Sequence, residues 1–92
     1  VEKKETVKKV NDYLLKKERR SQLLKMRNRL AKVEEEIENT ELEIDEINSK
    51  LTTSDYEELM DLTAKLDRKT QYRDILYTEW EELSERLTEA EE

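Results

Sequence analysis

A cluster of basic side chains lies between residues 16 and 32 of this 92-residue chain. Its members are Lys16, Lys17, Arg19, Arg20, Lys25, Arg27, Arg29 and Lys32. Residues 1–33 carry 12 Lys and Arg against 4 Asp and Glu, whereas residues 34–92 carry 6 against 21, so the net charge of −7 conceals two halves of opposite sign. A basic surface attracts phosphate backbones through counterion release, without reading bases. The cluster is therefore the candidate nucleic-acid-binding site, and a solvated basic face is the alternative.

Paired carboxylates offer a second kind of chemistry. Glu34 and Glu38, like Glu41 and Asp45, stand one helical turn apart, a spacing that a metal site or an acid–base pair could use. A slender helical chain has no enclosed pocket that could shift a carboxyl pKa or exclude water. The absence of His, Cys and Gly further excludes imidazole bases, thiolate chemistry, the usual zinc ligands and Gly-rich phosphate loops. We therefore expect no catalytic residue, metal or cofactor in this chain, which is not itself an enzyme.

The single tryptophan is a third candidate. Trp80 follows Tyr77, with Tyr72 and Arg73 two turns earlier. An exposed aromatic group of this kind could stack on a base or on a partner protein. The simpler interpretation is a large apolar anchor in a helix–helix seam.

The basic cluster lies at the start of a longer helical stretch, and that helix must position it. From residue 23 to residue 51 apolar side chains recur in alternating steps of three and four, with Thr40 filling the one gap. The apolar positions are Leu23, Met26, Leu30, Val33, Ile37, Ile44, Ile47 and Leu51. A seven-residue repeat keeps one narrow stripe on the same side of a helix, as in a coiled coil. We predict a helix over about residues 18–51.

A second helix is predicted over about residues 55–88. Ser54 followed by Glu57 resembles a capping box, and Asp55 adds negative charge where the helix dipole favours it. The seam of this helix is Leu59, Leu62, Leu66, Lys69, Arg73, Leu76, Trp80, Leu83 and Leu87. Opposite Thr40, Lys69 and Arg73 interrupt the apolar stripe, which predicts a polar layer that sets the register. The alternative is that these two residues are contact points for a partner.

The short turn between the helices predicts an antiparallel pairing. In the register that aligns the two seams, Val33 opposes Leu76 and Leu30 opposes Trp80. The flanking positions then pair opposite charges: Lys50 with Glu58, Glu43 with Lys65, and Arg29 with Glu79. The fold class is therefore all-α, a two-helix antiparallel coiled-coil hairpin formed by residues 18–92.

Residues 1–17 are predicted to form a linker or a short N-terminal helix. Val7, Val10 and Leu14 have helical spacing, but their stripe is out of phase with the seam that begins at Leu23. The two stripes therefore cannot belong to one interface.

Several runs of the chain resemble the C-terminal region of ABC-F ATPases, over about residues 11–87. They are Asn11-Asp12-Tyr13-Leu14, Lys16-Lys17-Glu18, Val33-Glu34-Glu35-Glu36-Ile37-Glu38, Ser54-Asp55-Tyr56-Glu57-Glu58-Leu59 and Leu76-Tyr77-Thr78-Glu79-Trp80-Glu81-Glu82-Leu83. Two features depart from the family pattern: the turn is short and lacks proline, and Lys69 stands where leucine is common. The resemblance implies an antiparallel coiled coil that follows the second ATP-binding cassette of a cytoplasmic ATPase without membrane spans.

The same resemblance implies that ATP and magnesium are bound by the parent protein, and that the coiled coil contacts DNA or ribosomal RNA. We expect an accessory arm, monomeric or weakly dimeric, with no membrane contact. The alternative is a structural or protein-interaction coiled coil without a nucleic-acid role. An enzymatic role comes third and would require turnover by these residues alone.

Overall fold

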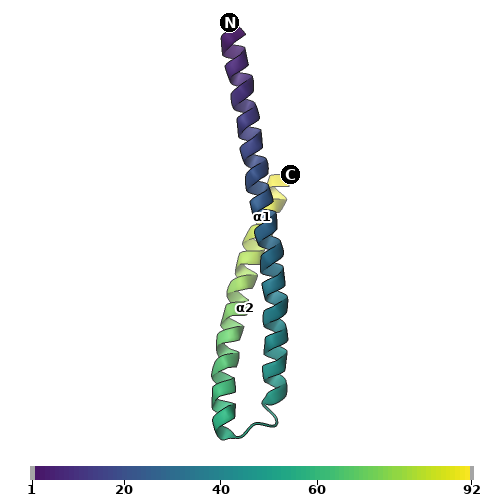
Figure 1. Ribbon diagram of the computed structural model, residues 1–92, viewed down its shortest axis with the longest axis vertical. Helices are drawn as coiled ribbons and strands as arrows, with labels where there is room; N and C mark the ends of the chain where they lie inside the picture. Colours follow the sequence, from purple (N-terminus) through teal and green to yellow (C-terminus); the bar gives the residue numbers. More distant parts are fainter. Residues whose placement is uncertain (1, 92) are drawn as a thin grey trace.

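The computed structural model describes the backbone of residues 2–91 and the side chains of residues 7–91. It contains two helices, α1 (Glu2–Lys50) and α2 (Tyr56–Glu91), joined by a short turn. They run antiparallel and form a rod of 81 × 20 × 14 Å, in which α1 extends well past the end of α2 (Figure 1). The prediction of an all-α helical hairpin is confirmed.

The predicted seam forms the core of the hairpin. Val33, Ile37, Leu76 and Leu83 make a buried cluster, against which Met26, Leu30 and Trp80 pack. Val33 is completely buried, and Ile44, Ile47 and Leu87 are also buried. Towards the turn the seam loosens, since Leu59 is 37% exposed. On α2 the fully buried seam residues therefore lie away from the turn, whereas α1 keeps Ile44 and Ile47 buried close to it.

The polar layer lies where the sequence places it. Thr40 is only 4% exposed, and its hydroxyl donates a 2.7 Å hydrogen bond to the carbonyl of Glu36 in the preceding turn. Lys69 and Arg73 are half-buried on α2, and Lys69 Nζ reaches Glu43 Oε2 at 2.5 Å. Each stem covers part of the seam while the charged group reaches its edge, as long basic side chains do on apolar surfaces.

The turn uses its hydroxyls differently from the prediction. Asp55, not Ser54, caps α2, because Asp55 Oδ1 accepts a 2.9 Å hydrogen bond from the Glu58 N–H. The Ser54 hydroxyl instead donates a 2.6 Å hydrogen bond to the carbonyl of Lys50. Without a glycine, α1 ends by satisfying that carbonyl with turn residues, and no described residue has a positive φ.

The expected change of structure near residue 17 is not seen in the backbone. α1 runs without interruption from Glu2 through the predicted boundary, and α2 likewise continues to Glu91. Since the sequence has no Gly or Pro, nothing in residues 2–30 stops a helix once it has formed. The out-of-phase stripe therefore lies on the same helix as the seam, on its far side.

Candidate nucleic-acid interface

All eight members of the basic cluster lie on α1 and are exposed; five stand in the half farther from the turn, and Arg27, Arg29 and Lys32 follow just past the midpoint of the helix. Lys16, Arg20 and Arg27 follow one side of the helix, whereas Lys25, Arg29 and Lys32 follow another, so the positive charge wraps around the rod. α2 ends beside this region, because Ala90 lies in a shallow hollow with Arg19 and Met26. Lys16 and Lys17 are thus on the part of α1 that extends beyond α2 (Figure 1).

One member of the cluster is bound within the hairpin by a two-point ion pair. Arg29 Nε lies 2.6 Å from Glu79 Oε1, and Arg29 Nη2 lies 2.9 Å from Glu79 Oε2. The hydrogen bonds from Arg29 lower the pKa of Glu79, and the same bonds raise the pKa of Arg29. This is the one flanking ion pair of the predicted register that forms as expected.

A second member is also paired within the chain. Arg27 Nη2 lies 2.6 Å from Glu91 Oε1, at the very end of α2. An acidic residue there is unfavourable for the helix dipole, so the cation on α1 offsets that cost. The six other members of the cluster form no ion pair among the described side chains. The structure therefore divides the cluster into two internally paired arginines and six exposed cations.

The aromatic side chains of α2 make hydrogen bonds to α1 that the sequence did not suggest. Trp80 packs on the core, and its Nε1–H donates a 3.0 Å hydrogen bond to Glu34. Trp80 is thus an anchor of the seam, half-buried and held at its polar end. This arrangement favours the interpretation as an anchor over that as a free stacking platform.

Two tyrosines also donate to glutamates of α1. The hydroxyl of Tyr72 donates a 3.1 Å hydrogen bond to Glu36, and the hydroxyl of Tyr77 donates one to Glu41. Hydrogen bonding to a carboxylate raises the pKa of both phenols. The predicted register could have revealed these two hydrogen bonds. Glu36 and Tyr72 stand on the flank that pairs Arg29 with Glu79, and Glu41 and Tyr77 stand on the opposite flank.

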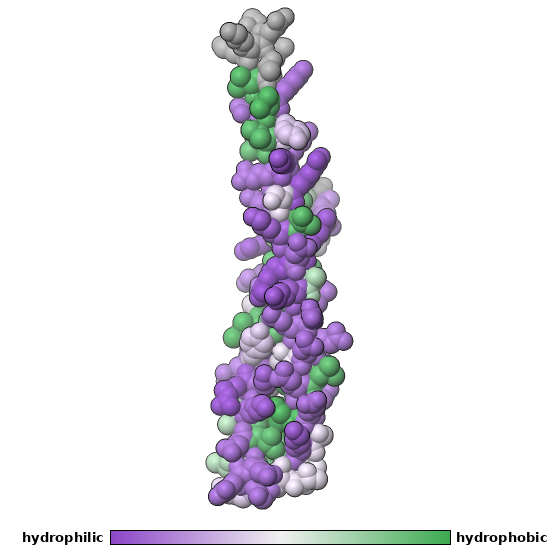
Figure 2. All heavy atoms as spheres, viewed as in Figure 1, coloured by the Kyte–Doolittle hydropathy of each residue, from purple (hydrophilic) through white to green (hydrophobic). Residues whose placement is uncertain are grey.

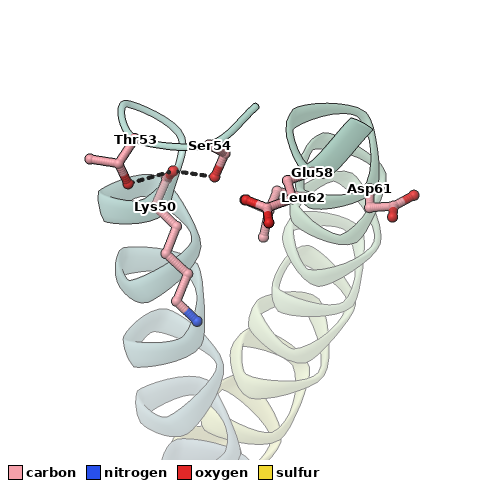
Figure 3. A pocket seen from close by; sticks show the side chains of 6 residues that line it. All are labelled: Lys50, Thr53, Ser54, Glu58, Asp61 and Leu62. Atoms are coloured by element: carbon pink, nitrogen blue, oxygen red, sulfur yellow. Dashed lines mark hydrogen bonds between the residues drawn. The ribbon is translucent and has the colours of Figure 1, made fainter. Parts of the chain in front are cut away.

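Two predicted flanking pairs are not formed as expected. Glu43 pairs with Lys69 instead of Lys65, because the Lys69 side chain emerges from the seam beside it. Lys50 and Glu58 make no ion pair within residues 7–91. They lie on either side of the turn, where the seam is looser and the ends of the helices stand apart (Figure 3).

A shallow hollow at the turn is lined by Lys50, Thr53, Ser54, Glu58, Asp61 and Leu62. Figure 3 shows Thr53 and Ser54 directed at the Lys50 carbonyl, whereas Asp61 points away from α1. The described residues hold no group of three or more metal-ligating side chains. The carboxylate pairs of α1 are exposed, apart from the half-buried Glu41.

The fold and the segregated charge together define an antiparallel coiled-coil domain with a basic and an acidic half. Residues 22–85 match the model of the family described as ABC transporter C-terminal domain. The chain therefore belongs to the ABC transporter C-terminal domain family, in agreement with the resemblance found in the sequence. No curated protein and no solved structure matches the chain. Within its described residues, neither helix is long and apolar enough to cross a membrane.

Proposed function

We propose that this chain is the non-catalytic accessory arm of an ABC-F type ATPase and that its basic cluster contacts nucleic acid, either DNA or ribosomal RNA. The ATP-binding cassettes belong to the parent protein, which we place in the cytoplasm. The ABC-F assignment is finer than the family match. It rests on the Ser54–Leu59 and Leu76–Leu83 runs described above.

The segregation of charge along the rod is the observation that carries the proposal. The exposed cations of the cluster gather on α1 around the end of α2 and just beyond it, whereas residues 34–92 are predominantly acidic. A polyanion would meet favourable potential only at the basic end, and the acidic half would repel it. Charge alone thus favours end-on contact, in which the rod stands away from the nucleic acid.

The first test is binding of the chain to labelled duplex DNA and to structured RNA over a series of salt concentrations. If phosphates are contacted, the logarithm of the binding constant falls linearly with the logarithm of the salt concentration. Preference for one probe over the other distinguishes DNA from RNA. Absence of binding to both probes at low salt would contradict the proposal.

The decisive variant removes only cations that are not paired within the hairpin. We expect Lys16→Gln/Lys17→Gln/Arg19→Gln/Arg20→Gln to weaken binding and to reduce the salt slope by about two to four, at about 0.9 per lost phosphate contact on duplex DNA. The matched control, Lys50→Gln/Lys65→Gln/Arg68→Gln/Arg86→Gln, changes the net charge equally at other positions. Equal effects of the two variants would show that only net charge matters.

The alternative function is protein interaction. It is favoured by the exposed apolar side chains of α1, among them Val7, Val10 and Leu14. If this function were the main one, the chain would bind another protein or form stable dimers at about micromolar concentration, and polyanion binding would be absent. Sedimentation measured alongside the nucleic-acid titration separates the two functions.

A further inference from the structure

α1 carries a second heptad stripe on the side opposite α2. The out-of-phase residues Val7, Val10 and Leu14 continue at the same alternating three- and four-residue steps through Lys17. The later positions of this outer stripe are Ser21, Leu24, Asn28 and Ala31. Because Ser21, Leu24, Asn28 and Ala31 each precede a seam position by two residues, the outer stripe lies roughly 200° around the helix from the seam.

Every position of the outer stripe from residue 7 to residue 31 is exposed. Leu14 is 53% exposed and Leu24 is 58% exposed, although both have the spacing of seam residues. Apolar side chains gather on the extending part of α1, next to the grey end of the rod (Figure 2). Ser21 and Ala31 are small enough for another backbone to approach, and a single asparagine such as Asn28 is a common register-setting residue in coiled-coil seams.

The charges beside the outer stripe select the occupant. Its charged flanking positions hold four cations, Arg20, Lys25, Arg27 and Lys32, and one acidic residue, Glu18, so a helix packed on this face would place its own flanking side chains mostly against cations. A second copy of the chain is disfavoured, because both faces would carry the same net positive charge and a parallel pair would oppose Arg20 and Lys25. Flanking Asp or Glu would instead form ion pairs.

We propose that the outer stripe of α1 binds an amphipathic helix of a partner protein, whose apolar stripe is bordered by acidic residues. α1 then serves as the shared helix of two interfaces, with α2 on one side and the partner helix on the other. This goes beyond contact with nucleic acid, since it uses an apolar face that phosphate does not need.

The test uses the whole chain and a fluorescent synthetic helix of three heptads, with Leu at the seam positions and Glu at the flanking positions. Fluorescence anisotropy should show saturable binding of this peptide, whereas a matched peptide with Lys at the flanking positions should not bind. Failure of the Glu peptide to bind, or equal binding of the Lys peptide, would overturn the proposal.

Two matched variants locate the binding face. Leu14→Ser/Leu24→Ser should weaken peptide binding by about tenfold or more, as expected when central apolar contacts are removed. Ile75→Ser should change it by less than about twofold, because Ile75 is 65% exposed but lies on α2. All three side chains are exposed, so circular dichroism should show unchanged helix content. Equal loss in both variants would contradict the assigned face.

A charge reversal tests the occupant's chemistry. Lys25→Glu/Lys32→Glu should bind the Lys peptide better than the Glu peptide, and an unchanged preference would overturn the assignment of an acidic partner. Leu14→Ser/Leu24→Ser retains every cation of the basic cluster and should bind duplex DNA as the unmodified chain does. The nucleic-acid proposal and the partner-helix proposal can therefore fail independently.

Discussion

Individual side chains at the edges of the seam fix how the helices face one another. Trp80, Tyr72 and Tyr77 donate hydrogen bonds from α2 to three different glutamates of α1. Each exposed contact contributes little stability in water. Their value is geometric, because a shift of register would break all of them together.

The two tyrosines should make the hairpin sensitive to alkaline pH. Hydrogen bonds to Glu36 and Glu41 raise the pKa of Tyr72 and Tyr77 in the folded state. A raised folded pKa gives stability that is present below the unfolded value of about 10 and is lost as the pH rises through the folded value. Ultraviolet titration should show a late-ionising component that Tyr72→Phe/Tyr77→Phe removes. Persistence of that component in the variant would refute the assignment.

The carboxylate of Asp55 forms the N-cap of α2. Asp55→Ala should lower the free energy of unfolding by about 1 kcal/mol, because it removes the acceptor of the Glu58 N–H. Ser54→Ala is the matched control, since the Ser54 hydroxyl bonds to the end of α1 and does not cap α2. Urea unfolding followed by circular dichroism measures both. A larger loss for Ser54→Ala would restore the capping box predicted from the sequence.

At the scale of the helices, the seven-residue repeat predicted most of the fold. The seam positions that it identifies are buried or half-buried, except Leu59 at the loose end. The choice between Ser54 and Asp55 as the cap could not be made from sequence, because both residue types favour that position and only the path of the turn decides. The pairing of Glu43 likewise depends on how far the Lys69 side chain bends out of the seam.

The sequence predicted which residues make up the candidate site, but not which of them are paired with acidic residues of the hairpin. Eight basic residues follow directly from the sequence, and all are exposed in the structure. That Arg27 is paired with Glu91 could not be foreseen, because the sequence-based boundary ended α2 before Glu91. Extending α2 by one turn places Glu91 on the flank that also pairs Glu41 with Tyr77.

The polar layer should lower the stability of the hairpin and at the same time fix the register of its helices. Lys69→Leu places an apolar side chain opposite Thr40 and should raise the free energy of unfolding by about 1 kcal/mol through added apolar burial. The same change removes the ion pair with Glu43 and a polar feature that disfavours other alignments. Thermal unfolding together with sedimentation should show higher stability and a greater tendency to associate. Lower stability would mean that the pair with Glu43 outweighs the apolar gain.

The whole molecule is a paired coiled coil with an unpaired helical extension. α1 and α2 support each other from the turn to the neighbourhood of Arg19 and Ala90, whereas the part of α1 that precedes Arg19 extends past the end of α2 (Figure 1). Isolated helices of this length are marginal in water, since most helix stability in proteins comes from packing. The extension therefore suits a segment whose structure is completed by a ligand.

Removal of residues 1–17 should show that the paired hairpin is stable without the helical extension. The free energy of unfolding of the remaining hairpin should change by less than about 0.5 kcal/mol, because the buried cluster of Val33, Ile37, Leu76 and Leu83 is untouched. Hydrogen exchange on the whole chain should agree: amides of residues 7–15 exchange fast, and those around Val33 exchange slowly. The acidic peptide of the partner-helix test should protect residues 7–15 if it binds the outer stripe. Strong protection of residues 7–15 without any ligand would show that the extension is stable alone and does not depend on a partner.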